Sequence, residues 1–322
     1  MNGPVLVTGA AGFAGSHLLD LLADGGAPVV AWRRPGERLP APPTGAGCRW
    51  AEVDVLDRDA VAHAVREAAP SSVYHLAGAA HVGHSWSDSA ATLAVNVLGT
   101  WHVLAALAAL PRPPRALVPG SALVYRQQDR PATEEDALQP ASPYAVSKLA
   151  QELTAIHAAR ELGVPVVVTR SFNHIGPRQS PSFSTAGFAR QIAMAEAGRS
   201  PREVRAGNLE ARRDLTDVRD IAAAYARLIA AGTPGRPYNV CSGRAVRVGE
   251  VLDGLVALAR VPITVRVDRS LLRPNDMPLV VGDPGRALRE VGWRPRIPLA
   301  DTLRDLLDFW RTEVVLAAPG RG

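Results

Sequence analysis

Residues 8 to 15 read Thr8-Gly9-Ala10-Ala11-Gly12-Phe13-Ala14-Gly15 and decide the fold, because they lie directly between an apolar strand and a helix. Three glycines in this setting are typical of a loop that binds a dinucleotide pyrophosphate at a helix N-terminus. Gly9 allows the tight turn, Gly12 lets the backbone approach the pyrophosphate, and Gly15 lets the helix pack closely on the strand. The spacing is GxxGxxG, and a plain glycine turn is the alternative that the flanking elements argue against. The other loop residues expected to contact the cofactor are Ala11, Phe13 and Ala14.

Short apolar strands alternate with helical stretches along the first half of the chain. The strands are expected at residues 4–7, 29–32, 72–76, 115–119 and 164–169, and the helices at 16–23, 60–68, 90–110 and around Tyr144. Strands that are apolar on both faces and alternate with helices predict a parallel sheet covered on both sides. The expected fold class is therefore α/β, with a doubly wound parallel (Rossmann) sheet.

The pattern is less regular beyond Ser171, because residues 172–214 are rich in Gly, Pro, Ser and Arg. A helix at 218–231 is expected to return to the sheet, and the elements after it are a helix at 249–260, a strand at 263–267 and a helix at 299–310. We therefore expect a smaller, discontinuous α/β domain over the ends of the strands. The predicted division assigns residues 1–171 and 215–242 to the nucleotide-binding domain, and residues 172–214 and 243–322 to the substrate domain.

The composition excludes several classes of protein. With 47% hydrophobic and 21% charged residues in 322, the chain can bury a large core. The net charge of +5 is spread without a block of like charges, so anionic small substrates fit better than nucleic acid. Cys48 and Cys241 form neither a disulfide framework nor a metal motif, and His81, His84 and His174 lack ligand spacing, so no metal is expected. Without a targeting or membrane-spanning segment, the protein is expected to be cytoplasmic.

A second motif, Ser142-Pro143-Tyr144-Ala145-Val146-Ser147-Lys148, places a tyrosine and a lysine on one helix face. An ammonium beside a phenol favours the phenolate, so the pKa of the phenol falls toward neutrality. Tyr144 is therefore a candidate general acid or base. The pair alone is also common on solvated helices, and its meaning depends on the other motifs.

The second strand ends Ala31-Trp32-Arg33-Arg34, where NAD-selective sites carry an acidic residue. A guanidinium can pair bidentately with a 2′-phosphate, so NADPH is predicted over NADH. Solvated loop arginines are the alternative. Asp54 and Val55 follow the third strand and are expected to frame the adenine, although an aspartate there also suits a turn. The cofactor-binding residues expected after the fourth strand are Leu76, Ala77 and Gly78.

The order of these motifs resembles that of extended short-chain dehydrogenases/reductases, the NAD-dependent epimerase/dehydratase family, over nearly the whole chain. The resemblance rests on Thr8 to Gly15, Asn96-Val97-Leu98-Gly99-Thr100, Ser121, and Tyr144 with Lys148. The C-terminal half is most similar to GDP-4-keto-6-deoxy-D-mannose reductases and related NDP-4-keto-6-deoxyhexose reductases. The stretches that carry this likeness are 171–177, 207–214, 217–220, 238–243 and 273–278.

The resemblance implies a role for each catalytic residue. Tyr144 would protonate the substrate oxygen, Ser121 would hydrogen-bond the same oxygen, and Lys148 would hold the nicotinamide ribose and lower the pKa of Tyr144. Donors fixed where alkoxide charge develops stabilise the transition state more than the ketone. Asn96 resembles the helix asparagine that supports the lysine region in this family, with a helix-start residue as the alternative.

The residues after Ser121 bear on the type of reaction. Dehydratases of this family carry an acid and a base there, whereas Ala122 and Leu123 cannot move a proton. The resemblance therefore favours a reductase over a 4,6-dehydratase. Leu123 and Arg126 stand where typical 4-reductases often carry Glu and Gly, which leaves a different sugar open.

The substrate-binding residues are carried over from the family. Arg213 and Arg273 would hold the diphosphate, because guanidinium groups suit phosphate oxygens, although either alone could be a surface ion-pair partner. The remaining candidates are Ser85, Ser121, Ala122 and Asn173 near the sugar and diphosphate, and Asn208 and Leu209 near the nucleoside.

The expected function is NADPH-dependent reduction of the 4-keto group of a GDP- or dTDP-linked 4-keto-6-deoxyhexose. A 4-epimerase that retains NAD would use the same Tyr, Lys and Ser, and Arg33 argues against it. A non-catalytic nucleotide-sensing protein is the third alternative, which the intact catalytic residues oppose. A homodimer that pairs through the helix at 90–110 and the Tyr144 helix is expected, with no nucleic-acid or membrane partner.

Overall fold

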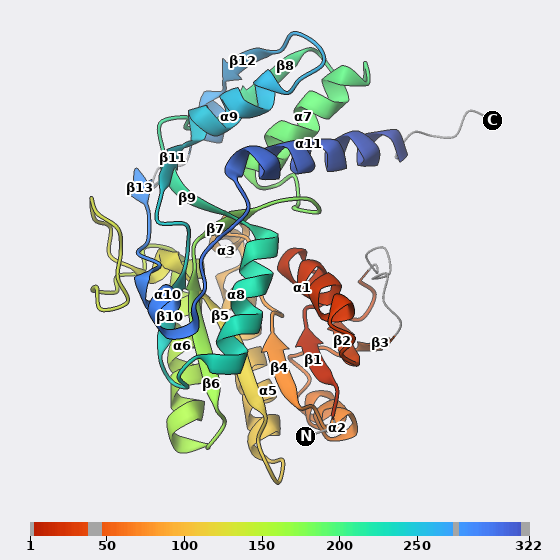
Figure 1. Cartoon of the computed structure of the whole chain (residues 1–322), viewed down its shortest axis with the longest axis vertical. Coiled ribbons are helices and arrows are strands. Elements are labelled where there is room, and N and C mark those ends of the chain that lie inside the picture. Colours follow the sequence, from red (N-terminus) through yellow and green to blue (C-terminus); the bar gives the residue numbers. More distant parts are fainter. Residues whose placement is uncertain (1–2, 38–46, 273–276, 317–322) are drawn as a thin grey trace, which may run out of the picture.

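The computed structural model describes residues 3–37, 47–272 and 277–316 of the chain. Figure 1 shows a larger lobe, in which a sheet lies between layers of helices, and a smaller lobe above it. The N-terminus lies at the far end of the larger lobe from the smaller one.

The larger lobe is built on a seven-stranded parallel sheet with the order β10-β6-β5-β4-β1-β2-β3. Its strands are β1 (Val5–Thr8), β2 (Val29–Arg33), β3 (Cys48–Glu52), β4 (Ser72–His75), β5 (Arg115–Ser121), β6 (Val166–Ser171) and β10 (Pro237–Val240). The strand order reverses between β1 and β4, which places a ligand crevice at the carboxyl ends of these strands. The predicted doubly wound parallel sheet is confirmed.

Two apolar cores cover the two faces of this sheet. One face packs against α2 (Arg58–Ala68), a continuous helical stretch made of α4 (Ser89–Leu93), η1 (Ala94–Gly99) and α5 (Thr100–Ala108), and α6 (Pro143–Glu161). The other face packs against α1 (Phe13–Asp24), α8 (Val218–Ala231) and α10 (Gly285–Val291), of which α1 and α8 lie in front of the sheet in Figure 1. The short helix α3 (His84–Ser87) precedes α4.

Local sequence explains where the key helices begin. Ser142 caps α6 by accepting a hydrogen bond from the Ala145 amide, and Pro143 occupies the first turn, where its missing N–H costs nothing. Asp57 caps α2 in the same way. By contrast, the Gly12 N-cap of α1 makes no side-chain capping bond. The amides of the first turn of α1 are therefore open to an anion.

The smaller lobe contains more regular structure than predicted. A four-stranded sheet is formed by β7 (Asn173–Ile175), β9 (Arg212–Asp217), β11 (Ala245–Arg247) and β13 (Leu279–Val280), and β8 (Glu203–Ala206) pairs with β12 (Thr264–Val267). Its helices are α7 (Ser184–Glu196), α9 (Val248–Ala257) and α11 (Leu299–Leu316). The segment 172–214, for which the sequence pattern predicted no individual element, contains β7, α7, β8 and the first three residues of β9. Small residues in α7 weaken its helical pattern, yet they let it pack closely in the core of this lobe.

The predicted two-domain division stays a prediction, but the packing differs from it at one segment. Ala287, Val291 and Trp293 belong to the core cluster of the larger sheet, since α10 contacts α8 and β10. This segment was expected in the substrate domain. Strand β9 also runs across the expected boundary at residue 215.

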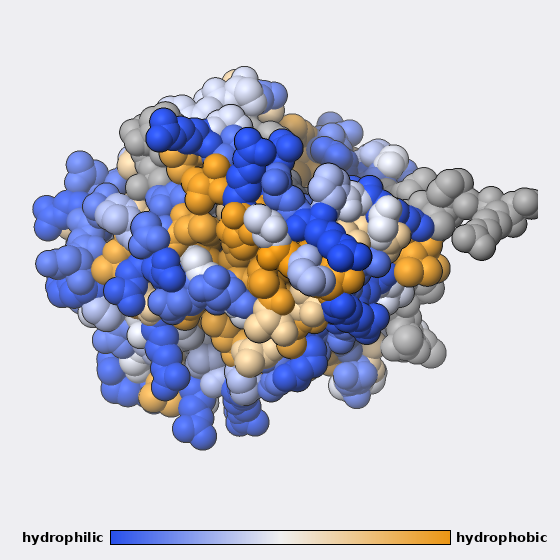
Figure 2. Space-filling model, turned by 90° about the horizontal axis from the view of Figure 1, so that it is seen from above, coloured by the Kyte–Doolittle hydropathy of each residue, from blue (hydrophilic) through white to orange (hydrophobic). Residues whose placement is uncertain are grey.

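Seen from the end of the smaller lobe, the surface carries an apolar band among polar side chains (Figure 2). Exposed large apolar residues of this lobe are Phe183, Val265, Val267, Leu271, Leu272, Val315 and Leu316.

Candidate active site

The glycine loop has the shape that a pyrophosphate requires. Gly9 has a φ of +62°, and a Cβ there would lie 2.5 Å from the Ala77 amide nitrogen. A Cβ on Gly15 would lie 2.4 Å from the Gly9 carbonyl oxygen, so only glycine lets α1 approach β1 this closely. With the uncapped first turn of α1, this cradle fits the pyrophosphate of a dinucleotide. Ala11, Gly12, Phe13 and Ala14 are partly exposed along it.

The other predicted cofactor residues lie at the same edge of the sheet. Arg33 ends β2, Asp54 and Val55 follow β3, and residues 76–78 follow β4. Asp54 is exposed and Val55 is buried. A Cβ on Gly78 would lie 2.9 Å from Asn96 Oδ1, so a larger residue here would displace the Asn96 side chain.

The two arginines after β2 have different surroundings. Arg33 Nη2 lies 2.5 Å from Glu52 Oε1, and its Nη1 donates to the Glu37 carbonyl oxygen. The Arg34 side chain is exposed, and its backbone N–H donates to the Glu37 carboxylate at 3.1 Å. The fold thus places a carboxylate beside Arg33 that the second strand itself lacks. Arg34 is consequently the more available guanidinium for a 2′-phosphate.

The three predicted catalytic residues meet at the carboxyl end of β5. Ser121 is the last residue of β5, and its side chain is hydrogen-bonded to that of Tyr144 in the first turn of α6. Burial raises the pKa of Tyr144, and the bond with Ser121 opposes this rise only in part. The implied lowering by Lys148 is therefore not seen, since Lys148 Nζ donates to the Pro119 carbonyl at 2.6 Å and to Gln151 Oε1. The Tyr144 phenol keeps its proton, as a general acid requires.

Lys148 is 8% exposed, and burial lowers its pKa to about 7 against the opposing charge of Glu152. It is also the only lysine among the 36 Lys and Arg residues of the chain. Arginine keeps its charge in any protein, whereas a buried lysine can lose it. A chain that uses arginine at every other cationic position therefore indicates that residue 148 needs an ammonium. This count was available from sequence and was missed.

Asn96 lies inside the helical stretch rather than at a helix start. It belongs to the π-helical turn η1, a distortion that often marks functional sites. Its Oδ1 accepts from the Ala79 amide at 2.8 Å, and its Nδ2 donates to Ser147 Oγ at 2.8 Å. Asn96 thus ties the loop after β4 to α6.

Ser85 is fully buried and lies beside the first turn of α6. Its Oγ accepts from the Tyr144 amide at 3.1 Å and donates to the Val82 carbonyl at 2.7 Å. Its single hydroxyl proton is therefore already used. In this arrangement Ser85 positions the first turn of α6, and the substrate contact implied by the resemblance stays a prediction.

The remaining substrate candidates come from both lobes. Ala122 is buried in the short helix η2 (Ala122–Val124) after β5, and Asn173 is exposed at the start of β7. Arg213 on β9 donates to the Met277 carbonyl at 2.7 Å, and Met277 lines a small hollow together with Ala122. Arg213 is therefore bonded to the backbone of a residue in the wall of this hollow.

Asn208 and Leu209 lie in the smaller lobe. Asn208 Oδ1 accepts from the Glu210 amide at 3.0 Å, and Leu209 packs partly buried against the core of that lobe. Arg273 lies outside the described residues. Nucleoside contacts by Asn208 and Leu209 stay predictions.

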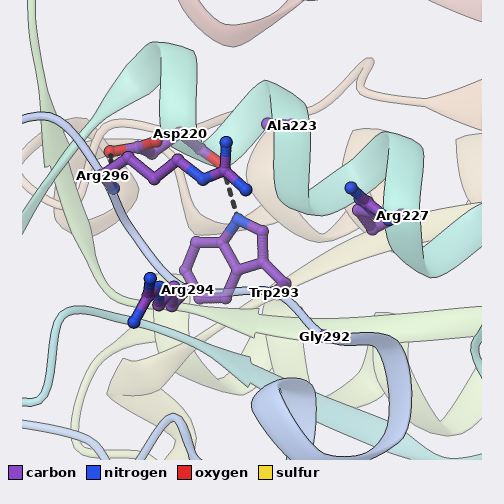
Figure 3. Close-up of a pocket in the computed structure, with 7 residues that line it drawn as sticks. All are labelled: Asp220, Ala223, Arg227, Gly292, Trp293, Arg294 and Arg296. Atoms are coloured by element: carbon purple, nitrogen blue, oxygen red, sulfur yellow. Dashed lines mark hydrogen bonds between the residues drawn. The ribbon is translucent and has the colours of Figure 1, made fainter.

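A second hollow, of about 150 Å³, lies between α8 and the chain that follows α10 (Figure 3). It is on the face of the large sheet that α1, α8 and α10 cover. Trp293 Nε1 donates to the Asp220 carbonyl at 3.1 Å, and the Asp220 carboxylate accepts from the Arg296 and Ile297 amides at 2.8 Å. These bonds clamp the chain after α10 to α8, so the site is structural. Within the described ranges, no group of three or more His, Cys, Asp or Glu could hold a metal ion.

Known proteins share this architecture. Residues 6–306 match the family model described as GDP-mannose 4,6 dehydratase. GDP-6-deoxy-D-mannose reductase of Pseudomonas aeruginosa is 36% identical over 98% of this chain and 99% of its own length. RMD from Pseudomonas aeruginosa, solved in complex with NADPH, superposes with a TM-score of 0.84 at 35% identity, covering 97% of this chain and 99% of that one.

An epimerase is similar in fold as well. UDP-glucose 4-epimerase from Thermus thermophilus, solved with NAD, superposes with a TM-score of 0.85 at 29% identity, covering 96% of this chain and 99% of that one. The chain therefore belongs to the GDP-mannose 4,6 dehydratase family of extended short-chain dehydrogenases/reductases.

Proposed function

We propose that this protein uses NADPH to reduce the 4-keto group of a nucleotide-linked 4-keto-6-deoxyhexose. The observation that carries the proposal is the 36% identity to a GDP-6-deoxy-D-mannose reductase over nearly the full length of both chains. The relative's name favours GDP over dTDP as the nucleotide.

The residues of this chain account for the proton transfer and for the stabilisation of the negative charge on the substrate oxygen. The raised pKa of Tyr144 keeps its phenol protonated at neutral pH, so it can donate a proton to the oxygen of the ketone. Ser121 is the second donor to that oxygen, and both stabilise the negative charge that develops on it. Lys148 would hold the nicotinamide ribose, and the glycine loop the pyrophosphate. NADPH, when bound, supplies the hydride.

The residues beside Ser121 favour reduction over dehydration. Elimination of water across the sugar needs an acid and a base next to the reacting carbons. Ala122 and Leu123 stand there, and neither side chain exchanges protons. We infer that this protein is a reductase, although the family model that it matches is described as a dehydratase.

An NAD-dependent 4-epimerase is the alternative that fold similarity leaves open, because the TM-scores to the reductase and to the epimerase are 0.84 and 0.85. The exposed Arg34 supports the reductase, since an acidic residue would be expected there in an NAD site.

The decisive experiment offers GDP- and dTDP-linked 4-keto-6-deoxyhexoses to the purified protein with NADPH or NADH. We expect stoichiometric NADPH oxidation and a product with a new 4-hydroxyl group, fastest with the GDP sugar. Protein that carries bound NAD and epimerises a nucleotide sugar without added cofactor would establish the alternative.

We further propose a cytoplasmic homodimer that pairs through α5 and α6. Leu98 and Leu153 are 52% and 57% exposed, and Val146 and Trp101 are also exposed. The ring of Trp101 lies 6.1 Å from that of His157, so the outer surfaces of the two helices adjoin. Light scattering of the wild type and of Leu153→Glu tests this, with a monomeric variant expected.

The same interface would account for the composition of one helix. Ser89–Ala108 is the single helix in the described part of the chain that is long and apolar enough to cross a membrane. Its inner face contributes Val103, Leu104 and Leu107 to the core of the larger lobe. Its outer face would be covered by the second subunit.

A further inference from the structure

A chain of buried polar side chains runs from the catalytic lysine to the strand before the glycine loop. Its members are Lys148, Gln151, Thr100, His75 and Thr8, which come from α6, α5, β4 and β1. Gln151 and His75 are each 1% exposed, and both threonines are fully buried. The proposed reaction assigns no role to Gln151, Thr100 or His75, and polar groups buried this deeply need a reason.

The hydroxyl of Thr100 determines the donor and the acceptor of every hydrogen bond in this network. Its one proton goes to the Asn96 carbonyl oxygen at 2.7 Å. Thr100 Oγ1 must therefore accept from its other two neighbours, Gln151 Nε2 at 2.8 Å and His75 Nε2 at 3.0 Å. His75 accordingly carries its proton on Nε2.

The hydrogen bonds at the Thr8 end of this network agree with this assignment. His75 Nδ1 then accepts from Thr8 Oγ1 at 2.8 Å, and Thr8 Oγ1 accepts in turn from the Ala77 amide at 3.1 Å. Each of the two threonine hydroxyls and the imidazole N–H therefore has one acceptor. Burial, followed by the charge of Lys148, lowers the pKa of His75 to about 3, which keeps its ring neutral.

These directions settle how Gln151 faces the lysine. Because its amide nitrogen is held by Thr100, its carbonyl oxygen must point to Lys148 Nζ, where it accepts a hydrogen bond. Pro119 O on β5 accepts a second N–H of the ammonium at 2.6 Å. An ammonium has three N–H donors, so one stays available for a ligand.

The charged groups around Lys148 do not replace this role of Gln151. Glu152 on the same helix favours the ammonium, but its carboxylate is bonded to Arg170 on β6 at 2.6 and 3.0 Å. Tyr144 on α6 and His75 on β4 are the other titratable groups nearby, and both are neutral. The direct side-chain acceptor of Lys148 is thus a neutral amide.

We propose that Gln151 is a positioning residue for Lys148, and that Thr100, His75 and Thr8 orient its amide so that the ammonium presents one N–H to the active site. The link to catalysis rests on the proposed function, whereas the effect on Lys148 does not.

The single lysine allows a direct test. Protein labelled with [¹³Cε]lysine gives one NMR signal, and its pH titration reports Lys148 without substrate or cofactor. Gln151→Glu places a carboxylate beside the ammonium, so we expect its pKa to rise by about 1 unit or more. Gln151→Leu removes an acceptor from the charged form, so the pKa should fall. Gln191→Leu is the matched control, because this amide bonds to the Arg205 backbone in the smaller lobe.

Thr100 provides a second test that leaves Gln151 in place. Thr100→Val frees the amide to rotate and turn its nitrogen toward Lys148, so the pKa should fall as in Gln151→Leu. Thr100→Ser keeps the hydroxyl and should restore the wild-type titration. Superimposable titrations of the wild type, Gln151→Glu and Thr100→Val would overturn the proposal.

Turnover separates this inference from the proposed function. The alkaline limb of kcat/KM for NADPH should move in the same direction as the NMR pKa in each variant. Shifted NMR titrations in a protein that reduces no ketosugar would support the role of Gln151 and refute the proposed reaction. Normal turnover with unshifted titrations would support the proposed reaction and refute the role of Gln151.

Discussion

Two buried cations, Lys148 of α6 and Arg170 of β6, are bonded to side chains of α6 in different ways. Lys148 meets neutral acceptors, the Pro119 carbonyl and the Gln151 amide. One turn away, Glu152 forms a two-bond ion pair with Arg170, at 2.6 and 3.0 Å. Arg170 also donates to the Tyr125 hydroxyl and the Glu134 carbonyl at 3.0 Å.

The difference separates a functional charge from a structural one. Burial alone would lower the pKa of Arg170, but its bonds to Glu152 and Tyr125 more than offset this, so its pKa is raised and its charge is permanent. Lys148 has a pKa of about 7 and can respond to an anionic ligand. Arg170, which stabilises the fold, is paired with a carboxylate. Lys148, which is proposed to act in the reaction, has only neutral hydrogen-bond acceptors.

The largest expected effect is on the functional side of α6. Tyr144→Phe removes the proton donor, and we expect kcat to fall by about 10²- to 10⁴-fold. The free energy of unfolding should change little, since the ring is retained. NADPH oxidation and urea unfolding measure the two quantities, and a variant with near wild-type kcat would exclude Tyr144 as the acid.

Arg170→Leu should have the opposite profile. It leaves Glu152 buried without its partner, which costs about 3–5 kcal/mol of stability. Urea unfolding checks this, with the double variant Arg170→Leu/Glu152→Leu as the control. The double variant should be more stable than Arg170→Leu alone, and an additive loss would show that the two residues are not coupled.

The pH dependence of stability sharpens the contrast further. The pKa of Lys148 is about 7 in the folded protein and ordinarily 10.5, so the unfolded chain binds more protons between these values. Stability therefore rises with pH from about 7 to about 10.5, by at most about 1.4 kcal/mol per pH unit. Urea midpoints of the wild type relative to Lys148→Met should show this rise, and parallel pH curves would contradict the lowered pKa.

The same contrast recurs more weakly between the two arginines after β2. Arg33 is paired with Glu52, whereas the side chain of Arg34 is exposed. Arg34→Ala should raise the KM for NADPH about tenfold, the value of one charge-assisted bond, and leave the KM for NADH unchanged. Arg33→Ala is the matched control, and a larger loss of NADPH preference there would reverse the assignment.

Sequence reasoning was most successful where function depends on local geometry. The helix at 218–231 and the cofactor loop were predicted from periodicity and glycine spacing, which act over a few residues. It was least successful in the segment 172–214, where α7 has a weak pattern and β8 has its partner about sixty residues away. The hydrogen bond between Ser85 and Tyr144 was not predicted for the same reason, because the two residues are distant in the chain.

The sequence by itself determined the doubly wound sheet, the tyrosine and lysine on one helix face, and the use of a single lysine at position 148. Tertiary structure alone decided what surrounds these groups. The pairing of Arg33 with Glu52 and the contact of Gln151 with Lys148 depend on where strands and helices meet. The pKa values of Tyr144 and Lys148 depend mainly on burial, which is set by the whole fold and not by neighbours in the chain.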